Sequence, residues 1–217
     1  MHISKSILAV AFAAFASMSA AAPSKRYFPD DNCGAAFHVG SLIVDGPAPV
    51  NHRRASFQGA EDSQSRLELT TEYDGTYSPD YPQFAFVPCN STNMPNGPVT
   101  NKDGSVTRFG LLHPNAHRTR CVSAEAIIQS NPQPLVSDPF CPNADGELYF
   151  QYWSLTTYTS KKGKTLNHTL GFVGYSAQDF QRKTNLLYSF TVVNLGDSSG
   201  VDLVWNATSP YTITMAL

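Results

Sequence analysis

Charged residues are scarce in this sequence, and so are stretches that could form a helix. Only 15% of the 217 residues are Asp, Glu, Lys or Arg, whereas 41% are hydrophobic and 12% are aromatic. This balance excludes a disordered polyampholyte and a fibrous low-complexity protein. The 14 glycines and 15 prolines are spread along the chain and argue against long helices. One short run, Val122–Ser130, is compatible with a helix, and the prolines after it argue against an α/β fold.

Beyond its first residues the sequence also lacks an apolar run of the length that crosses a membrane. The beginning itself resembles a signal peptide over residues 1–21, because Lys5 precedes the apolar stretch Ile7–Phe15 and small residues follow it. A short pro-segment, residues 22–26, ends in the dibasic pair Lys25-Arg26. We therefore predict a secreted, extracellular protein with one mature domain over residues 27–217 and no membrane partner.

The predicted mature chain has no stripe of basic residues. Removing residues 1–26 leaves 12 basic and 17 acidic side chains, a net charge of −5. A mildly acidic surface gives no electrostatic footprint for nucleic acid, so a nucleic-acid partner is not expected.

The cysteines and sequons fit an oxidising, secretory environment. An even number of cysteines in such a compartment predicts two disulfides, formed among Cys33, Cys89, Cys121 and Cys141. No pair has the Cys-x-x-Cys spacing and no histidine pair lies nearby, so neither a metal nor another cofactor is expected. Three Asn-x-Ser/Thr sequons predict glycosylation on exposed turns, at Asn90, Asn167 and Asn206.

Short segments with alternating apolar residues, rich in Val, Phe, Tyr and Thr, predict an all-β protein. They form three groups of four: Phe37–Val44, Ala55–Gln58, Arg66–Thr70 and Gln83–Val87; Phe109–His113, Arg120–Ala124, Leu135–Cys141 and Leu148–Leu155; Leu170–Tyr175, Leu187–Val193, Val201–Trp205 and Tyr211–Met215. Repeated units of four strands favour a β-trefoil of three units. A two-sheet β-sandwich or jelly roll is the alternative.

The second group carries three motifs in order: Cys121-Val122-Ser123, Cys141-Pro142-Asn143 and Gln151-Tyr152-Trp153. Residues 120–155 thereby resemble one repeat of the ricin B-type lectin β-trefoil. The segment Phe84–Thr92 and the mature chain as a whole also resemble small secreted proteins of mushroom-forming fungi.

The lectin resemblance implies a role for several residues. It implies that Trp153 is a core residue and that Gln151 ties down the local structure. Of the family's sugar contacts, the resemblance carries over Phe140 and Asn143, while Ser123 stands where the family has an acid. It further implies a Cys121–Cys141 disulfide within the unit, which leaves Cys33 to pair with Cys89.

No catalytic constellation stands out, so a non-catalytic protein is expected. The segment Gly196–Gly200 resembles the surroundings of the nucleophile in chymotrypsin-like proteases, but the histidine segment of that family is missing, and a hairpin turn is the better interpretation. Three tyrosines recur every four residues in the loop Glu72–Pro82, where their rings could stack on sugars, fill a protein interface or cover the end of the domain: Tyr73, Tyr77 and Tyr81.

Two functions from different classes remain open. The first is a secreted, non-catalytic, lectin-like protein that binds glycans. The alternative is a secreted β-trefoil inhibitor of an extracellular protease, because Leu42–Pro47 resembles the first hairpin of Kunitz-type inhibitors. An extracellular structural or effector protein without a small ligand is what remains if both fail.

Overall fold

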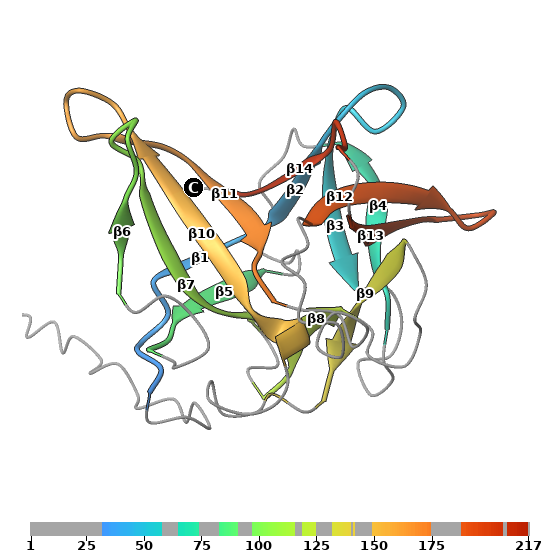
Figure 1. Cartoon of the computed structure of the whole chain (residues 1–217). Coiled ribbons are helices and arrows are strands. Elements are labelled where there is room, and N and C mark those ends of the chain that lie inside the picture. Colours follow the sequence, from blue (N-terminus) through green and yellow to red (C-terminus); the bar gives the residue numbers. More distant parts are fainter. Residues whose placement is uncertain are drawn as a thin grey trace, which may run out of the picture.

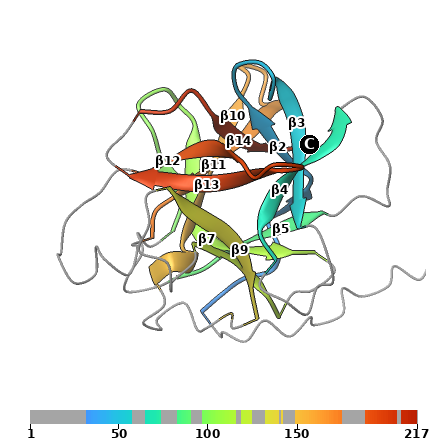
Figure 2. The same cartoon turned by 90° about the vertical axis from the view of Figure 1, so that its right-hand side faces the viewer.

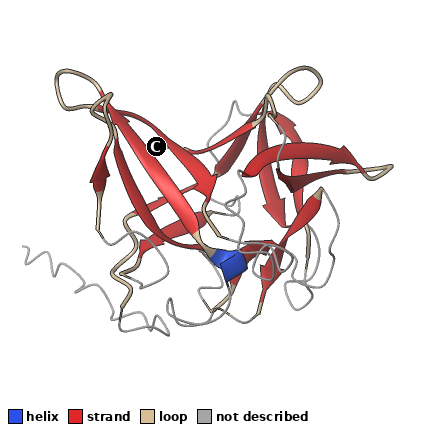
Figure 3. Cartoon of the chain, in the orientation of Figure 1, coloured by secondary structure: helices blue, strands red, loops and turns tan. Residues whose placement is uncertain are grey.

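The computed structural model describes residues 32–57, 65–73, 83–90, 97–115, 119–124, 132–139, 141, 149–174, 188–205 and 208–216, with only the backbone of residues 71–73. These residues form an all-β, antiparallel structure with one short 3-10 helix (Figure 3). The strands are β1 His38–Gly40, β2 Leu42–Asp45, β3 His52–Phe57, β4 Leu67–Tyr73, β5 Phe84–Pro88, β6 Val99–Thr100, β7 Val106–Pro114, β8 Cys121–Ala124, β9 Gln133–Asp138, β10 Trp153–Thr159, β11 Thr165–Phe172, β12 Tyr188–Asn194, β13 Ser199–Trp205 and β14 Thr212–Met215. The 3-10 helix is η1, Tyr149–Gln151.

Six strand pairings form a ring that returns to its start. β1 pairs with β5, β5 with β7, β7 with β10, β10 with β11, β11 with β14, and β14 with β2. Only Ser41 separates β1 from β2, so one extended segment closes the path. We call these strands the ring; its pairs β7–β10 and β10–β11 are seen side by side in Figure 1.

The long β10–β11 hairpin illustrates why the ring strands form. Along β10 the buried apolar residues Trp153 and Leu155 stand two positions apart, and the strand becomes exposed at Tyr158 and Thr159, a pattern that suits a sheet with one buried face. The chain turns over residues 160–164, where the Gly163 amide donates to the carbonyl of Ser160 at 2.8 Å. Gly163 has a φ of +78°, a conformation in which glycine carries no steric cost.

Three further hairpins pack against the ring and against one another: β3–β4, β8–β9 and β12–β13. β13 lies between the other two, since Gly200 pairs with Glu68 and Asp202 pairs with Pro134 (Figure 2). An ion pair adds to this junction, because one terminal nitrogen of Arg66 donates to both carboxylate oxygens of Asp202 at 2.6 Å. Burial raises the pKa of the Asp202 carboxyl, and the hydrogen bond and charge of Arg66 oppose that shift.

The core fills the space between the ring and the three hairpins. Trp153 contacts Phe172 edge-on at 5.4 Å between ring centroids and stacks on Phe190 at 6.2 Å, so it joins β10 to β11 and to β12. The other inward residues alternate along the ring strands in the same way: Leu42, Val44, Phe84, Phe86, Leu155, Leu170, Ile213 and Met215. Each buried side chain of this size contributes about 1.5–3 kcal/mol through burial alone.

The predicted all-β class is confirmed, and every predicted strand segment overlaps an observed strand. Several predicted boundaries differ from the observed strands by three residues or more, as at the starts of β3 and β7, and β6 was not predicted. Phe37–Val44 is interrupted at Ser41, and β10 begins at Trp153 because residues 149–151 form the 3-10 helix. β11 begins at Thr165, five residues before the predicted start at Leu170. The sequence pattern did not indicate this first half of the strand, because it is polar and partly exposed.

The helix-compatible run Val122–Ser130 begins within β8, and residues 125–130 lie outside the described part of the chain. Among the described residues, no helix has the length and apolar character needed to cross a membrane.

Candidate functional site at the β8–β9 hairpin

Most of the predicted ligand-binding residues lie outside the described residues. This holds for Tyr77, Tyr81, Phe140 and Asn143. Tyr73 ends β4, where its backbone pairs with Arg53, but its side chain is not described. These five residues therefore stay predictions.

The sequons differ in how much of them is described. Asn90 and Asn167 are exposed, and Asn206 lies outside the described residues. Asn167 lies within β11 rather than on a turn, in the first half of the strand, where the neighbouring Leu166 is exposed as well.

The structure pairs the cysteines as the lectin resemblance implied. Cys33 is bonded to Cys89 across 56 residues, with the two Cα atoms 4.0 Å apart. Cys121 is bonded to Cys141 across 20 residues, with the Cα atoms 5.1 Å apart. The second disulfide ties the start of β8 to the segment that follows β9, which fixes the base of the hairpin.

Trp153 anchors the ring to this hairpin. Its side chain is 1% exposed, and its indole N–H donates to the carbonyl of Val122 in β8 at 2.8 Å. The expectation that Trp153 belongs to the core is confirmed. A buried indole needs such an acceptor, so this bond fixes where β8 lies on β10.

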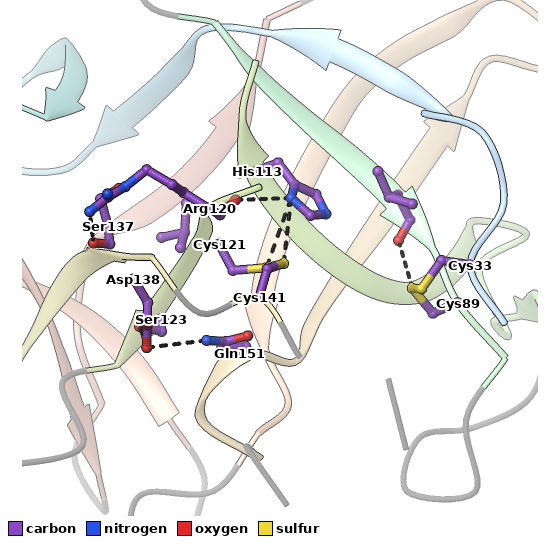
Figure 4. Close-up of a disulfide and its surroundings, with 12 residues drawn as sticks. Cys33, Cys89, His113, Arg120, Cys121, Ser123, Ser137, Asp138, Cys141 and Gln151 are labelled. Atoms are coloured by element: carbon purple, nitrogen blue, oxygen red, sulfur yellow. Dashed lines mark hydrogen bonds between the residues drawn. A yellow bond between two sulfur atoms is a disulfide. The ribbon is translucent and has the colours of Figure 1, made fainter. Parts of the chain in front are cut away.

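A polar group of three side chains lies beside the anchor (Figure 4): Ser123, Asp138 and Gln151. The fully buried Gln151 amide donates from Nε2 to Oδ2 of Asp138 at 3.2 Å, and the Ser123 hydroxyl lies 3.5 Å from the same oxygen. Gln151 thus ties η1 to the end of β9 through the Asp138 carboxylate. We call these three residues the β8–β9 site.

Sequence reasoning missed Asp138. Ser123 occupies the place where the lectin repeat has an acid, but Asp138 lies opposite Cys121 in the hairpin register and supplies a carboxylate from the other strand. The carboxylate is half-buried. The sequence signal that could have found it is its position at the end of a predicted β-strand, three residues before Cys141.

Arg120 and His113 support the hairpin from its other side. The Arg120 guanidinium donates to the Ser137 hydroxyl and to the Ser137 carbonyl, both at 2.8 Å. Nδ1 of the fully buried His113 lies 2.9 Å from the Arg120 carbonyl and 3.6 Å from Sγ of Cys141 (Figure 4).

The ligand-type atoms of His113, Cys121 and Cys141 lie within 4.8 Å of one another, which is close enough to hold a metal ion. Both sulfurs are bonded to each other, however, and metals bind thiolates rather than disulfide sulfurs. The arrangement is therefore a packed disulfide with a histidine beside it for as long as that bond is intact.

The chain matches no protein-family model, and neither a curated protein nor a solved structure matches it significantly.

The side chains of the β8–β9 site are suited to polar recognition. A carboxylate accepts hydrogen bonds, whereas an amide and a hydroxyl can both donate and accept them. The disulfide and Trp153 hold the strands that carry these groups.

Proposed function

We propose that this chain is a secreted, non-catalytic β-trefoil protein that binds glycans. The strand pairings support the trefoil: a closed ring of strands with three hairpins packed on it, each hairpin lying between two ring strands in the sequence. One continuous pairing path favours this architecture over the two-sheet sandwich. The two disulfides and the signal-peptide pattern support secretion.

The contact from Gln151 to Asp138 is the observation that carries the binding proposal. It holds a half-buried carboxylate in one orientation beside the Ser123 hydroxyl, and oriented carboxylates and amides are the groups that bind sugar hydroxyls. Phe140 and Asn143 follow Asp138 by two and five residues, so they are candidates for the aromatic and amide side of the same site. The tyrosines Tyr73, Tyr77 and Tyr81 are a second candidate region.

A glycan array probed with the secreted, folded protein tests this proposal. We expect retention on a defined set of glycans, and we expect Asp138→Asn to weaken it by about tenfold or more, because a hydrogen bond to a charged group is lost. Asp197→Asn is the matched control, since it removes a carboxylate from the exposed β12–β13 turn. The variants Phe140→Ala, Asn143→Ala and the triple tyrosine-to-alanine variant then locate the binding region. No retention of the parent across a broad array refutes the proposal.

The exposed loop between β2 and β3 favours a protease inhibitor as a second candidate function. Residues 47–49 between β2 and β3 are exposed, whereas Val50 is buried and its amide donates to the Pro47 carbonyl at 3.0 Å. An exposed loop with a buried anchor is what an inhibitor presents to an active site. Titration against serine, cysteine and aspartic proteases tests it, with a variant in which Pro47, Ala48 and Pro49 are replaced by glycine. Inhibition that the loop variant loses would favour the inhibitor over the lectin.

A further inference from the structure

A second group of side chains gathers at the far end of the ring from the β8–β9 hairpin. Arg108 comes from β7, His168 from β11, His38 from β1, and Phe37 directly precedes β1. We call these four residues the β1/β7/β11 cluster. They lie far apart in the sequence and come together because their strands belong to the same ring.

Aromatic contacts hold the cluster together. The Arg108 guanidinium carbon lies 4.0 Å from the centroid of the Phe37 ring, and the His168 imidazole meets the same ring edge-on at 6.2 Å. The His38 and His168 rings are 4.2 Å apart between centroids. Phe37 is 40% exposed, whereas His168 is 5% exposed, so the cluster extends from the surface to the interior of the ring.

Hydrogen bonds fix how the histidines are oriented. Nε2 of His38 lies 2.6 Å from the Ala216 carbonyl oxygen, which can only accept, so the Nε2 atom carries a hydrogen. Nδ1 of His168 contacts the Thr157 hydroxyl at 3.0 Å.

The positive charge of the cluster has no carboxylate partner among the described residues. Within the described part of the chain, Arg108, His38 and His168 make no ion pair with an acid. The carboxylate of Asp103, in the neighbouring β6–β7 turn, accepts hydrogen bonds from the Ser105 amide and hydroxyl. The other charged groups of the adjoining turns are lysines: Lys102, Lys161, Lys162 and Lys164.

The electrostatic state of His168 agrees with this lack of negative charge. Burial, and after it the charges of His38 and Arg108, together lower the pKa of His168 to about 4. A bound anion would reverse the electrostatic part of this effect, because an opposite charge favours the protonated imidazole.

We propose that the β1/β7/β11 cluster binds an oxyanion group, such as a sulfate, phosphate or carboxylate, through the Arg108 guanidinium, with the imidazoles of His38 and His168 beside it. The guanidinium supplies a fork of N–H donors that matches two oxygens, and Phe37 holds its plane. This site is separate from the β8–β9 site and does not depend on the proposed glycan binding there.

NMR titration of the histidine side chains with sodium sulfate tests the proposal. At pH 7 and constant ionic strength we expect saturable shifts of the His38 and His168 resonances, because both rings belong to the cluster that holds Arg108. His52, which pairs with Asp45 at 2.5 Å on the other side of the ring, is the internal control and should not saturate.

Variants separate a specific site from general attraction to the basic turns. Arg108→Gln should weaken sulfate binding by about tenfold, since a charge-assisted contact is lost. Lys161→Gln, which removes an exposed positive charge from the β10–β11 turn, should change it by less than about twofold. Phe37→Ala supplies a second variant if Arg108→Gln does not fold, and it should weaken sulfate binding by about two- to fivefold, because the ring that holds the Arg108 guanidinium is lost.

A sulfated monosaccharide and its unsulfated parent distinguish the source of the oxyanion. Tighter binding of the sulfated sugar than of inorganic sulfate indicates an acidic glycan, and equal binding indicates a free anion. Absence of saturable shifts, or equal affinity in the parent and both variants, would overturn the proposal. Asp138→Asn should leave the sulfate titration unchanged, so failure of the glycan proposal and failure of this one are distinguishable.

Discussion

Removal of Arg66 should destabilise the protein strongly at neutral pH and weakly in acid. Asp202 has a side chain that is 2% exposed, and both of its oxygens accept from Arg66 at 2.6 Å. Arg66→Met keeps much of the side-chain volume but leaves this carboxylate buried without its partner. Breaking a buried pair in this way costs about 3–5 kcal/mol. The free energy of unfolding should fall by that amount at pH 7, as measured by urea denaturation.

The pH dependence gives this prediction its sharpest test. Burial already raises the pKa of Asp202 above its ordinary value, and loss of Arg66 should raise it further. An acid whose pKa is raised by folding stabilises the folded state at low pH and loses that contribution as the pH rises through the folded pKa. The gap between parent and variant should therefore narrow as the pH falls and Asp202 becomes protonated.

Two results would refute this reasoning. One is a loss below about 1 kcal/mol at pH 7, which would mean that the pair behaves as a surface ion pair. The other is a loss that stays constant between pH 7 and pH 4. The control is Lys162→Met, which removes an exposed charge and should change the free energy of unfolding by less than about 0.5 kcal/mol. Arg54→Met would not serve as a control, because Arg54 is itself buried.

Three further predictions concern stability. Trp153→Phe should lower the free energy of unfolding, measured in urea, by about 1–3 kcal/mol, because the buried carbonyl of Val122 loses its indole donor. An unchanged free energy of unfolding would contradict the assigned hydrogen bond. Replacing Cys121 and Cys141 together by alanine should cost about 3 kcal/mol in the same assay, given the 20-residue separation; an unchanged midpoint would show that the bond does not form. His168 has a folded pKa of about 4 against 6.5 unfolded, so the parent should lose up to about 3 kcal/mol between pH 6.5 and pH 4, as the unfolded chain takes up a proton that the folded chain does not. The variant His168→Gln should lack this loss, and an identical pH profile for parent and variant would exclude it.

The strand pattern could be predicted from the sequence because it depends on local alternation. The inward apolar residues of β10 and β14 repeat every second position, and this period alone identifies a half-buried strand. The start of β10 could not be predicted, since Tyr149 and Phe150 are as apolar as strand residues yet belong to a 3-10 helix. The first half of β11 was missed because it has few apolar residues.

The candidate sites depend on long-range contacts, which local patterns do not encode. Asp138 reaches Ser123 only because the β8–β9 hairpin adopts one register, and a shift by one residue would turn its side chain to the other face. Arg108 and His168 are brought together by the pairing of β7 and β11 with β10. The disulfide between Cys121 and Cys141 could be predicted from the sequence because the resemblance to a lectin repeat implied it.

Retention of the secreted protein on a glycan array, compared with that of Asp138→Asn, tests the central proposal most directly. Both proteins should be checked for the same unfolding midpoint before comparison, so that a loss of binding cannot come from a loss of fold. The proposal predicts retention of the parent on a defined set of glycans, at least about tenfold weaker retention of Asp138→Asn, and unchanged retention of Asp197→Asn. A parent that binds no glycan, or an Asp138→Asn variant that binds like the parent, would contradict glycan recognition at the β8–β9 site.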